Sequence, residues 1–175
     1  MDKLKIACIL LLTIMLSCSE GKNKEGVSKN GLVFKNDIDQ IAGWVSNPSI
    51  TCGEGHSGKY FCKVDSSIEF SYGFSNFLAN ISSSKLKKVK FSSWCKSDNM
   101  QNKAVLVCSI CEEGKSLAWV GVDLKKMIKK PNEWTYIFGD IMIPEKRSPK
   151  TEVKVYLWNP KKDVAYADDF EIVFE

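Results

Sequence analysis

The chain has 175 residues, of which 44% are hydrophobic and 26% are charged, and this length suits one compact domain rather than two. No apolar run reaches the roughly 18 residues that a membrane-spanning helix needs, which excludes an integral membrane domain. The net charge of +4 comes from lysine, because Arg147 is the single arginine among 25 basic residues. Since guanidinium forks read guanine and clamp phosphates, this composition predicts no nucleic-acid partner.

The N-terminal segment has the layout of an export signal, with lysines near its start, an apolar run over residues 6–16 and then Leu16-Ser17-Cys18. It resembles a bacterial lipoprotein signal, in which an aliphatic and a small residue precede an acylated cysteine. The resemblance implies that residues 1–17 are removed and that lipid on Cys18 anchors the protein to a membrane of the cell envelope, in particular the outer membrane. The alternative is an ordinary signal peptide with a chance cysteine.

Residues 18–30 predict a flexible tether, because the run over 19–26 contains no apolar residue. From Gly31 to Glu175, short apolar alternations separated by turn residues predict an all-β domain of the sandwich or barrel class. A helix is predicted over residues 124–130, and Pro131 ends it. The predicted strands span residues 32–34, 59–64, 67–74, 87–96, 103–111, 117–122, 133–137, 152–158 and 166–174.

Alternation within these strands predicts which way their aromatic residues point. Trp94 falls on the lysine-bearing face of its strand, and Tyr156 and Trp158 fall on the charged face of theirs. Trp119 lies opposite three apolar neighbours. The four aromatic side chains therefore have the parity to share one exposed sheet face, whereas Asp168 points toward the core.

Several motifs, in this order and spacing, resemble those of the galactose-binding-domain-like jelly rolls. This family includes many carbohydrate-binding modules and domains of bacterial lipoproteins of the Bacteroidetes type. The resemblance covers residues 31–175 and implies a jelly-roll β-sandwich of two antiparallel sheets. The motifs are Gly43-Trp44, His56-Ser57-Gly58-Lys59-Tyr60, Trp94, Glu133-Trp134-Thr135, Tyr156-Leu157-Trp158-Asn159-Pro160 and Tyr166-Ala167-Asp168-Asp169-Phe170-Glu171-Ile172.

A glycan is the ligand that this resemblance implies, because flat aromatic rings stack on the C–H faces of sugars. The expected function is non-catalytic glycan binding at the cell envelope. The alternatives are that the aromatics are buried by packing, and that the domain is a structural or protein-interaction module without a sugar ligand. The expected ligand-binding residues are Trp94, Trp119, Tyr156, Trp158 and Asn159, with Lys88, Lys96 and Lys154 as further hydrogen-bond donors.

A structural calcium ion is also implied by the resemblance, since such jelly rolls often hold one. The expected ligands are the Asp168 carboxylate, carbonyls near Gly58 and Lys59, and Asp37, because calcium prefers oxygen ligands. Lys35 stands where the family often has glutamate, which is a departure from the pattern. The alternative is that Asp168 and the aspartate after it accept backbone N–H bonds at a turn.

Catalysis is not predicted. Asp168 and Asp169 are neighbours on a strand and point to opposite faces, so they cannot flank one glycosidic bond. Glu112-Glu113 sits at a turn, and His56 has no nucleophile of catalytic pattern near it. The chain is therefore expected to bind rather than to react.

Five cysteines remain after Cys8 leaves with the signal and Cys18 takes lipid. An oxidising compartment allows disulfides, so Cys52 and Cys62 are candidates to staple their loop, and Cys95 and Cys108 to meet across paired strands. The alternative is that most are small buried hydrophobic residues. The Cys108-x-x-Cys111 spacing lacks a second ligand pair, so zinc is not expected.

Overall fold

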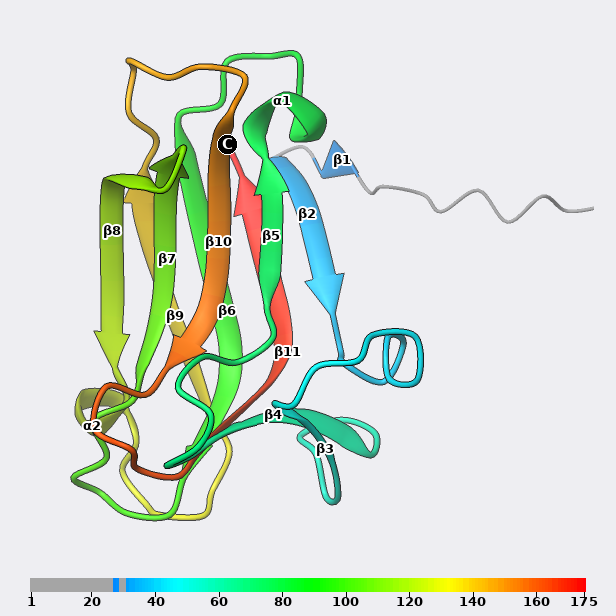
Figure 1. Ribbon diagram of the computed structural model, residues 1–175, viewed down its shortest axis with the longest axis vertical. Helices are drawn as coiled ribbons and strands as arrows, with labels where there is room; N and C mark the ends of the chain where they lie inside the picture. Colours follow the sequence, from blue (N-terminus) through cyan, green and yellow to red (C-terminus); the bar gives the residue numbers. More distant parts are fainter. Residues whose placement is uncertain (1–26, 29–30) are drawn as a thin grey trace, which may run out of the picture.

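The computed structural model describes residues 27–28 and 31–175. They form two antiparallel sheets that lie face to face (Figure 1), which confirms the predicted all-β jelly-roll sandwich. The predicted signal, the lipidation site Cys18 and most of the tether lie outside the described residues. Within the described part of the chain, no helix is long and apolar enough to cross a membrane.

The larger sheet has seven strands, with β11 at its centre. Strand β11 pairs with β2 and β4 along one edge and with β6 along the other, and β9 extends the sheet beyond β6. The strands are β1 (Val27–Ser28), β2 (Gly31–Asn36), β3 (Ile50–Cys52), β4 (Tyr60–Val64), β6 (Lys88–Ser97), β9 (Thr135–Met142) and β11 (Ala165–Phe174).

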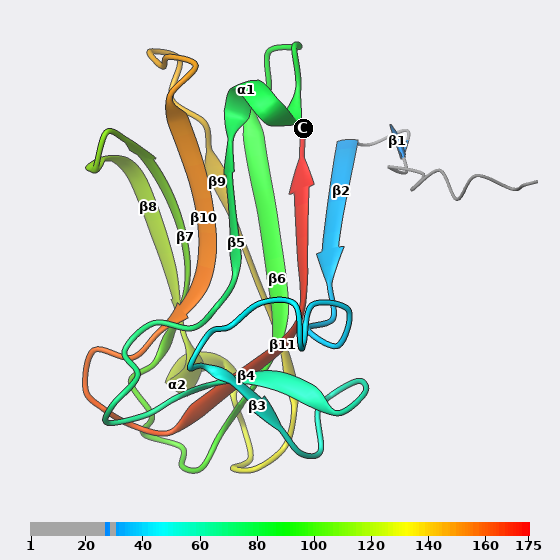
Figure 2. The same cartoon turned by 45° about the vertical axis from the view of Figure 1, so that its right-hand side comes forward.

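The smaller sheet has four strands in the order β5-β10-β7-β8. Two one-turn helices, α1 (Leu78–Ile81) and α2 (Leu124–Met127), lie at opposite ends of the sandwich (Figures 1 and 2). The strands are β5 (Phe74–Phe77), β7 (Val105–Glu112), β8 (Lys115–Asp123) and β10 (Thr151–Trp158).

The core lies between the two sheets and follows the period-two alternation of the strands. In β10, Val153, Val155 and Leu157 are fully buried, and the residues between them are half-buried. Phe91, Phe170 and Phe174 of the larger sheet are the bulkiest fully buried side chains. Burial of each such side chain contributes about 1.5–3 kcal/mol, so this inner face fixes which side of every strand looks outward.

Two predicted strands differ from the structure. Residues 67–73 follow the edge of β10 through isolated bonds, such as that from Ser71 N to Leu157 O at 2.9 Å, and the ladder begins at Phe74. Strand β9 continues to Met142, five residues beyond the predicted end at Ile137. Strand β3 and helix α1 were not predicted from the sequence, because each is too short to show a periodic pattern.

The five cysteines of the described residues are all free thiols. Cys62, Cys95 and Cys108 are buried in the core, and burial raises the pKa of each to about 12. The predicted pairing of Cys95 with Cys108 is wrong, because β6 and β7 belong to different sheets. Exposed Cys52 lies opposite Tyr60 in the β3–β4 ladder and does not bond to Cys62. Three of the five therefore act as small apolar side chains.

Candidate functional site

The four aromatic residues predicted to share a face are divided between the two sheets. Trp94 lies on β6 of the larger sheet, whereas Trp119, Tyr156 and Trp158 lie on β8 and β10 of the smaller one. Each points outward, as its strand parity predicts, but the outer faces of a sandwich look in opposite directions. The single shared platform is therefore wrong, because alternation gives the face of a strand and not the sheet that the strand joins.

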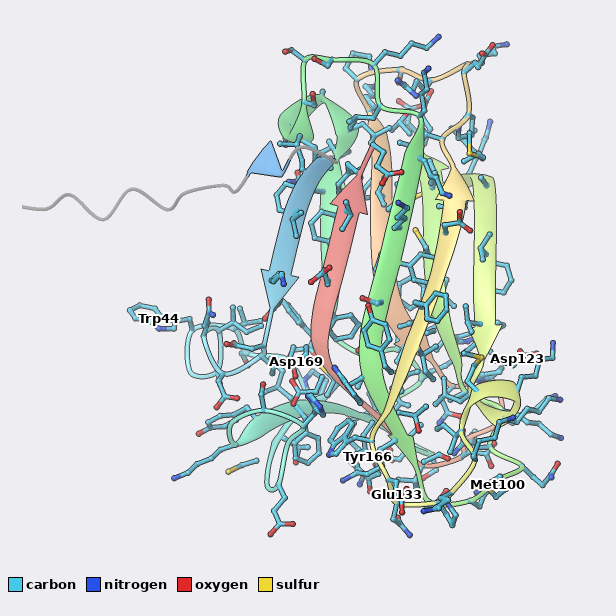
Figure 3. All side chains as sticks on the ribbon, turned by 180° about the vertical axis from the view of Figure 1, so that it is seen from behind. Trp44, Met100, Asp123, Glu133, Tyr166 and Asp169 are labelled. Carbon is cyan, nitrogen blue, oxygen red and sulfur yellow. The ribbon has the colours of Figure 1, made fainter. Side chains whose placement is uncertain are left out.

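A groove runs over the outer face of β11, β6 and β9, which is the face toward the reader in Figure 3. The register places Glu171, Ser92 and Phe138 in one row, and Trp94 beside Tyr136 in the next. Ser92 is short, so the taller neighbours rise around it and leave the face hollowed. Two adjoining cavities, of about 670 and about 390 Å³, share Ser92, Tyr136 and Glu171, and together they are called the groove below.

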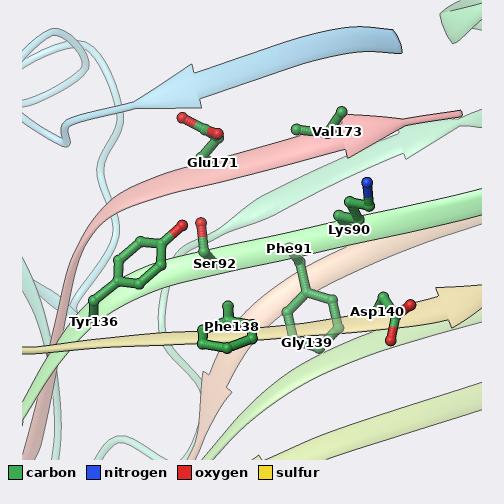
Figure 4. Close-up of a pocket in the computed structure, with 9 residues that line it drawn as sticks. All are labelled: Lys90, Phe91, Ser92, Tyr136, Phe138, Gly139, Asp140, Glu171 and Val173. Carbon is green, nitrogen blue, oxygen red and sulfur yellow. The ribbon is translucent and has the colours of Figure 1, made fainter. Parts of the chain in front are cut away.

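Aromatic side chains line the groove along β9. The Tyr136 and Phe138 side chains are 45% and 60% exposed, and their ring centroids lie 6.0 Å apart with planes inclined by 29°. The Trp94 ring centroid lies 5.6 Å from that of Tyr136. In Figure 4 the Tyr136 ring reaches from β9 toward Ser92 and Glu171. The two exposed rings, with the half-buried Trp94 beside them, suit the C–H faces of a sugar chain.

The Trp94 indole is held from the side of the β3–β4 connection. The His56 ring stacks on it at 3.9 Å, with an interplanar angle of 11°. His56 Nδ1 lies 2.5 Å from an Asp169 carboxylate oxygen, and the Ser57 hydroxyl donates to the other oxygen at 2.7 Å. The single histidine of the chain thus holds an aromatic side chain that lines the groove.

The lysines in and around the groove are held in ion pairs. The Lys35 ammonium lies 2.6 Å from Glu171, Lys88 pairs with Asp140, and Lys90 pairs with Glu175. The hydrogen bond that Lys35 donates to Glu171 raises the pKa of Lys35. Among the described residues, Asp37 and Asp169 also line the groove without a lysine partner, so its carboxylates outnumber its ammonium groups, which fits a neutral polyhydroxylated ligand better than an anionic one.

The residues predicted to bind calcium are engaged with other partners. Asp168 is fully buried, and its two oxygens accept backbone N–H bonds from His56, Ser57 and Asp169 at 2.8–3.2 Å. Burial raises the pKa of Asp168 to about 6, against these donors, which lower it. These backbone N–H bonds are the ones that the turn alternative predicts.

Of the other predicted calcium ligands, the Gly58 carbonyl lies near Asp168, because a Cβ added at Gly55 would be 2.9 Å from Asp168 Oδ2 and 3.5 Å from Gly58 O. Asp37 accepts from the backbone and side chain of Gln40, and the N–H of Lys59 bonds to Asp39, whose carboxylate also packs against Gly58. Among residues 27–28 and 31–175, no three His, Cys, Asp or Glu side chains converge as a metal site. Calcium binding at Asp168 therefore stays a prediction.

The polar residues predicted to contact ligand have structural partners. Asn159 is buried, and its side-chain amide donates to the carbonyls of Asp65 and Asp163 at 3.0 and 2.6 Å. The side chain is therefore not available to a ligand. The Lys96 ammonium lies 4.5 Å from the Trp134 ring centroid, in a cation–π contact. Lys154 forms an ion pair with Glu152 at 3.1 Å.

Tyr136, Phe138 and Glu171 were not among the predicted ligand residues. The signal for the two aromatics was present, because Tyr136, Phe138 and Asp140 alternate with apolar or small residues along the whole of β9. The predicted strand ends at Ile137, so Phe138 and Asp140 fall outside it and the alternation is incomplete. Glu171 had no local signal, because its place beside Ser92 depends on the pairing of β11 with β6.

No family model and no curated protein matches the sequence of this chain. A structure of TmCBM61 in complex with beta-1,4-galactotriose is 13% identical, with a TM-score of 0.40, over 82% of this chain and 82% of that one. The CBM22-1 xylan-binding domain from Paenibacillus barcinonensis Xyn10C is 12% identical, with a TM-score of 0.41, over 71% of this chain and 78% of that domain.

An arabinose-bound MgGH51 α-L-arabinofuranosidase is 14% identical, with a TM-score of 0.48, over 82% of this chain. The match covers 25% of that enzyme, so this chain spans about a quarter of its length. Carbohydrate-binding modules with a β-sandwich fold are thus among the structural neighbours of the chain, and the likeness concerns the fold alone.

Proposed function

We propose that the protein binds a neutral glycan, without catalysis, in the groove of the larger sheet. The observation that carries the proposal is the row formed by Trp94, Tyr136 and Phe138 beside the charge-balanced groups at Lys35 and Glu171. Sugar-binding sites combine apolar stacking with a few directed hydrogen bonds. This groove presents both kinds of contact on one rigid sheet.

The carboxylates of the groove favour binding over hydrolysis. A glycosidase needs one protonated and one ionised carboxyl group flanking the scissile bond. Glu171 and Asp140 each form an ion pair with a lysine. Asp168, which has the raised pKa, is fully buried and bonded to backbone N–H groups. We therefore assign no carboxyl group of the groove the role of proton donor.

We infer further that the domain is tethered to the bacterial cell envelope through lipid on Cys18. The support is the sequence pattern of residues 1–18 and the apolar-free run after it. At least two acyl chains are needed for stable anchoring. Expression of the full chain in a Gram-negative host, with palmitate labelling, tests this inference. The expected result is labelled protein in the membrane fraction and loss of both label and membrane association in Cys18→Ser. Unlabelled wild-type protein contradicts it.

A glycan array on the purified protein tests the binding proposal. We expect retention of neutral polysaccharides that is strongly reduced in Tyr136→Ala. The matched control is Trp44→Ala, which removes a tryptophan that is 90% exposed and lies outside the groove. If the array shows no glycan binding, the alternative of a structural or protein-interaction module is favoured. If Tyr136→Ala binds as well as the control, the groove is not the site.

A further inference from the structure

The outer face of the smaller sheet carries a separate aromatic cluster, called the second aromatic surface below. It consists of Phe70, Trp119, Tyr156 and Trp158. The Phe70 and Trp158 rings are parallel within 4° with centroids 6.5 Å apart, and the Trp119 ring stands at 87° to Trp158, 6.3 Å away. Phe70 is 52% and Trp119 49% exposed. These rings form an open corner that the fold leaves uncovered.

Specific contacts hold both indoles in place. Trp158 Nε1 donates to a Glu69 carboxylate oxygen at 2.9 Å, which turns one edge of the indole toward the 65–73 segment. The Trp119 ring lies over Gly121, where an added Cβ would approach the ring to 2.4 Å. Any larger residue at position 121 would lift the indole from the sheet. The corner is therefore preorganised, which lowers the entropy lost when a ligand stacks on it.

A hollow of about 410 Å³ adjoins the corner, lined by Phe70 and Tyr156 together with Ser75 and Lys154. The Lys154 ammonium pairs with Glu152, and the Ser75 hydroxyl donates to the same carboxylate group. As in the groove, apolar ring surface lies next to hydroxyl, ammonium and carboxylate groups. A flat C–H face with hydroxyls at its rim fits this combination.

We propose that the second aromatic surface is a second glycan-binding site and that one molecule bridges two glycan chains. This inference rests on the proposed function of the groove. The two sheets look in opposite directions, so a chain bound on one face does not compete with a chain on the other. Two linked weak sites retain a polymeric ligand far better than either does alone.

A sugar fits this surface better than a protein partner does. A stable protein interface buries about 800 Å² on each side. Four aromatic side chains, each partly covered, expose roughly 400 Å². Ion-paired and hydroxyl groups interrupt the surrounding sheet face, so the apolar patch does not extend. The patch matches the size of a short oligosaccharide.

Native gel electrophoresis of the purified protein through xylan, galactan or mannan, together with turbidity of the soluble polysaccharide, tests the inference. We expect wild-type protein to be retarded and to cross-link the polysaccharide. Trp119→Ala should remain retarded, with about a threefold weaker affinity, but lose the turbidity. Phe77→Ala is the matched control, because Phe77 is an exposed aromatic of the same sheet outside the cluster. The double variant Trp119→Ala, Tyr136→Ala should lose both retardation and turbidity.

The outcomes separate the two proposals. If Trp119→Ala cross-links like the control, the second site is overturned while the groove stands. If Tyr136→Ala alone abolishes all retardation, the second aromatic surface binds no glycan. If wild-type protein is not retarded by any of the polysaccharides, the proposed function and the bridging inference both fail. Melting temperatures of all variants exclude loss of fold as the cause.

Discussion

The two outer faces of the sandwich present aromatic rings in different ways. In the groove, Tyr136 and Phe138 stand two residues apart on one strand, with the short Ser92 side chain between them and Glu171. On the second aromatic surface, the rings come from β8, β10 and the 65–73 segment, and they pack on one another both edge to face and in parallel. The shape of the groove is thus fixed by strand register, whereas the second aromatic surface is assembled from several segments.

Because of this difference, we expect the two surfaces to respond differently to the loss of one aromatic side chain. The groove keeps its shape when one ring is removed, because the pairing of the strands sets the spacing of the other rings. A corner built from mutually packed rings changes shape when any member is lost. The groove is therefore expected to carry the tighter binding and the second surface the weaker contact.

Filling the groove should give the largest effect. Ser92→Phe places a ring where the cavities meet and removes no ring and no ion pair, so we expect about 100-fold weaker glycan binding. The matched control is Ser109→Phe, because Ser109 lies beside Trp119 and Lys154 on the outer face of the other sheet. The control should keep groove affinity and lose cross-linking, as measured by calorimetry and turbidity. Equal effects of the two changes would remove the distinction between the faces.

The next effect concerns the buried carboxyl behind the groove. Burial raises the native pKa of Asp168 to about 6 from an ordinary value of 3.8. Between these values the native state holds more protons than the unfolded state, so this group adds stability as the pH falls. Relative to Asp168→Asn, the free energy of unfolding of the wild type should rise by about 2 kcal/mol from about pH 7 to about pH 4.5.

Urea denaturation of both proteins across this pH range measures the effect. Carboxyl groups whose pKa is lowered, such as Asp65 and Glu112, contribute less to the free energy of unfolding as the pH falls. They are present in both proteins, so their contributions cancel in the difference. Parallel curves for the wild type and the variant would show that Asp168 is not protonated in the native state.

Removal of the ring behind Trp94 should have a moderate effect. His56→Ala deletes the stacking partner at 3.9 Å and the contact with Asp169 but leaves every groove-lining side chain in the protein. We expect a roughly threefold to fivefold loss of glycan affinity, because the indole gains freedom that binding must then restrict. Cross-linking through the second surface should persist at higher protein concentration. An unchanged affinity would show that Trp94 needs no support.

Salt should have the smallest effect. Because the lysines around the groove are ion-paired, raising NaCl from about 0.05 to about 0.5 M should change the affinity for a neutral polysaccharide less than twofold. The same titration with an acidic polysaccharide serves as the contrast, since any binding there should weaken steeply. A strong salt dependence with the neutral polymer would mean that the contacts are chiefly ionic.

The sequence allowed the sandwich and the outward direction of each aromatic to be predicted, because period-two alternation records burial directly. It placed Trp94 on the outer face, and the structure confirms that position. It did not predict that Trp94 and Trp158 lie on opposite sides of the molecule, since sheet membership depends on long-range pairing. For the same reason, the partnership of Ser92 with Glu171 was visible only after β11 and β6 were paired. Asn159 was misassigned because a polar side chain next to a strand end gives no sign of being buried.

The central claim is that the rings of β9 hold the glycan, and the double variant Tyr136→Ala, Phe138→Ala tests it most directly. Both side chains are exposed, so the variant should keep the melting temperature of the wild type within a few degrees. Calorimetric titration with the polysaccharide that the array identifies should then show at least a 30-fold loss of affinity, about 2 kcal/mol. Wild-type affinity in this folded variant would contradict the claim and place glycan binding elsewhere on the molecule.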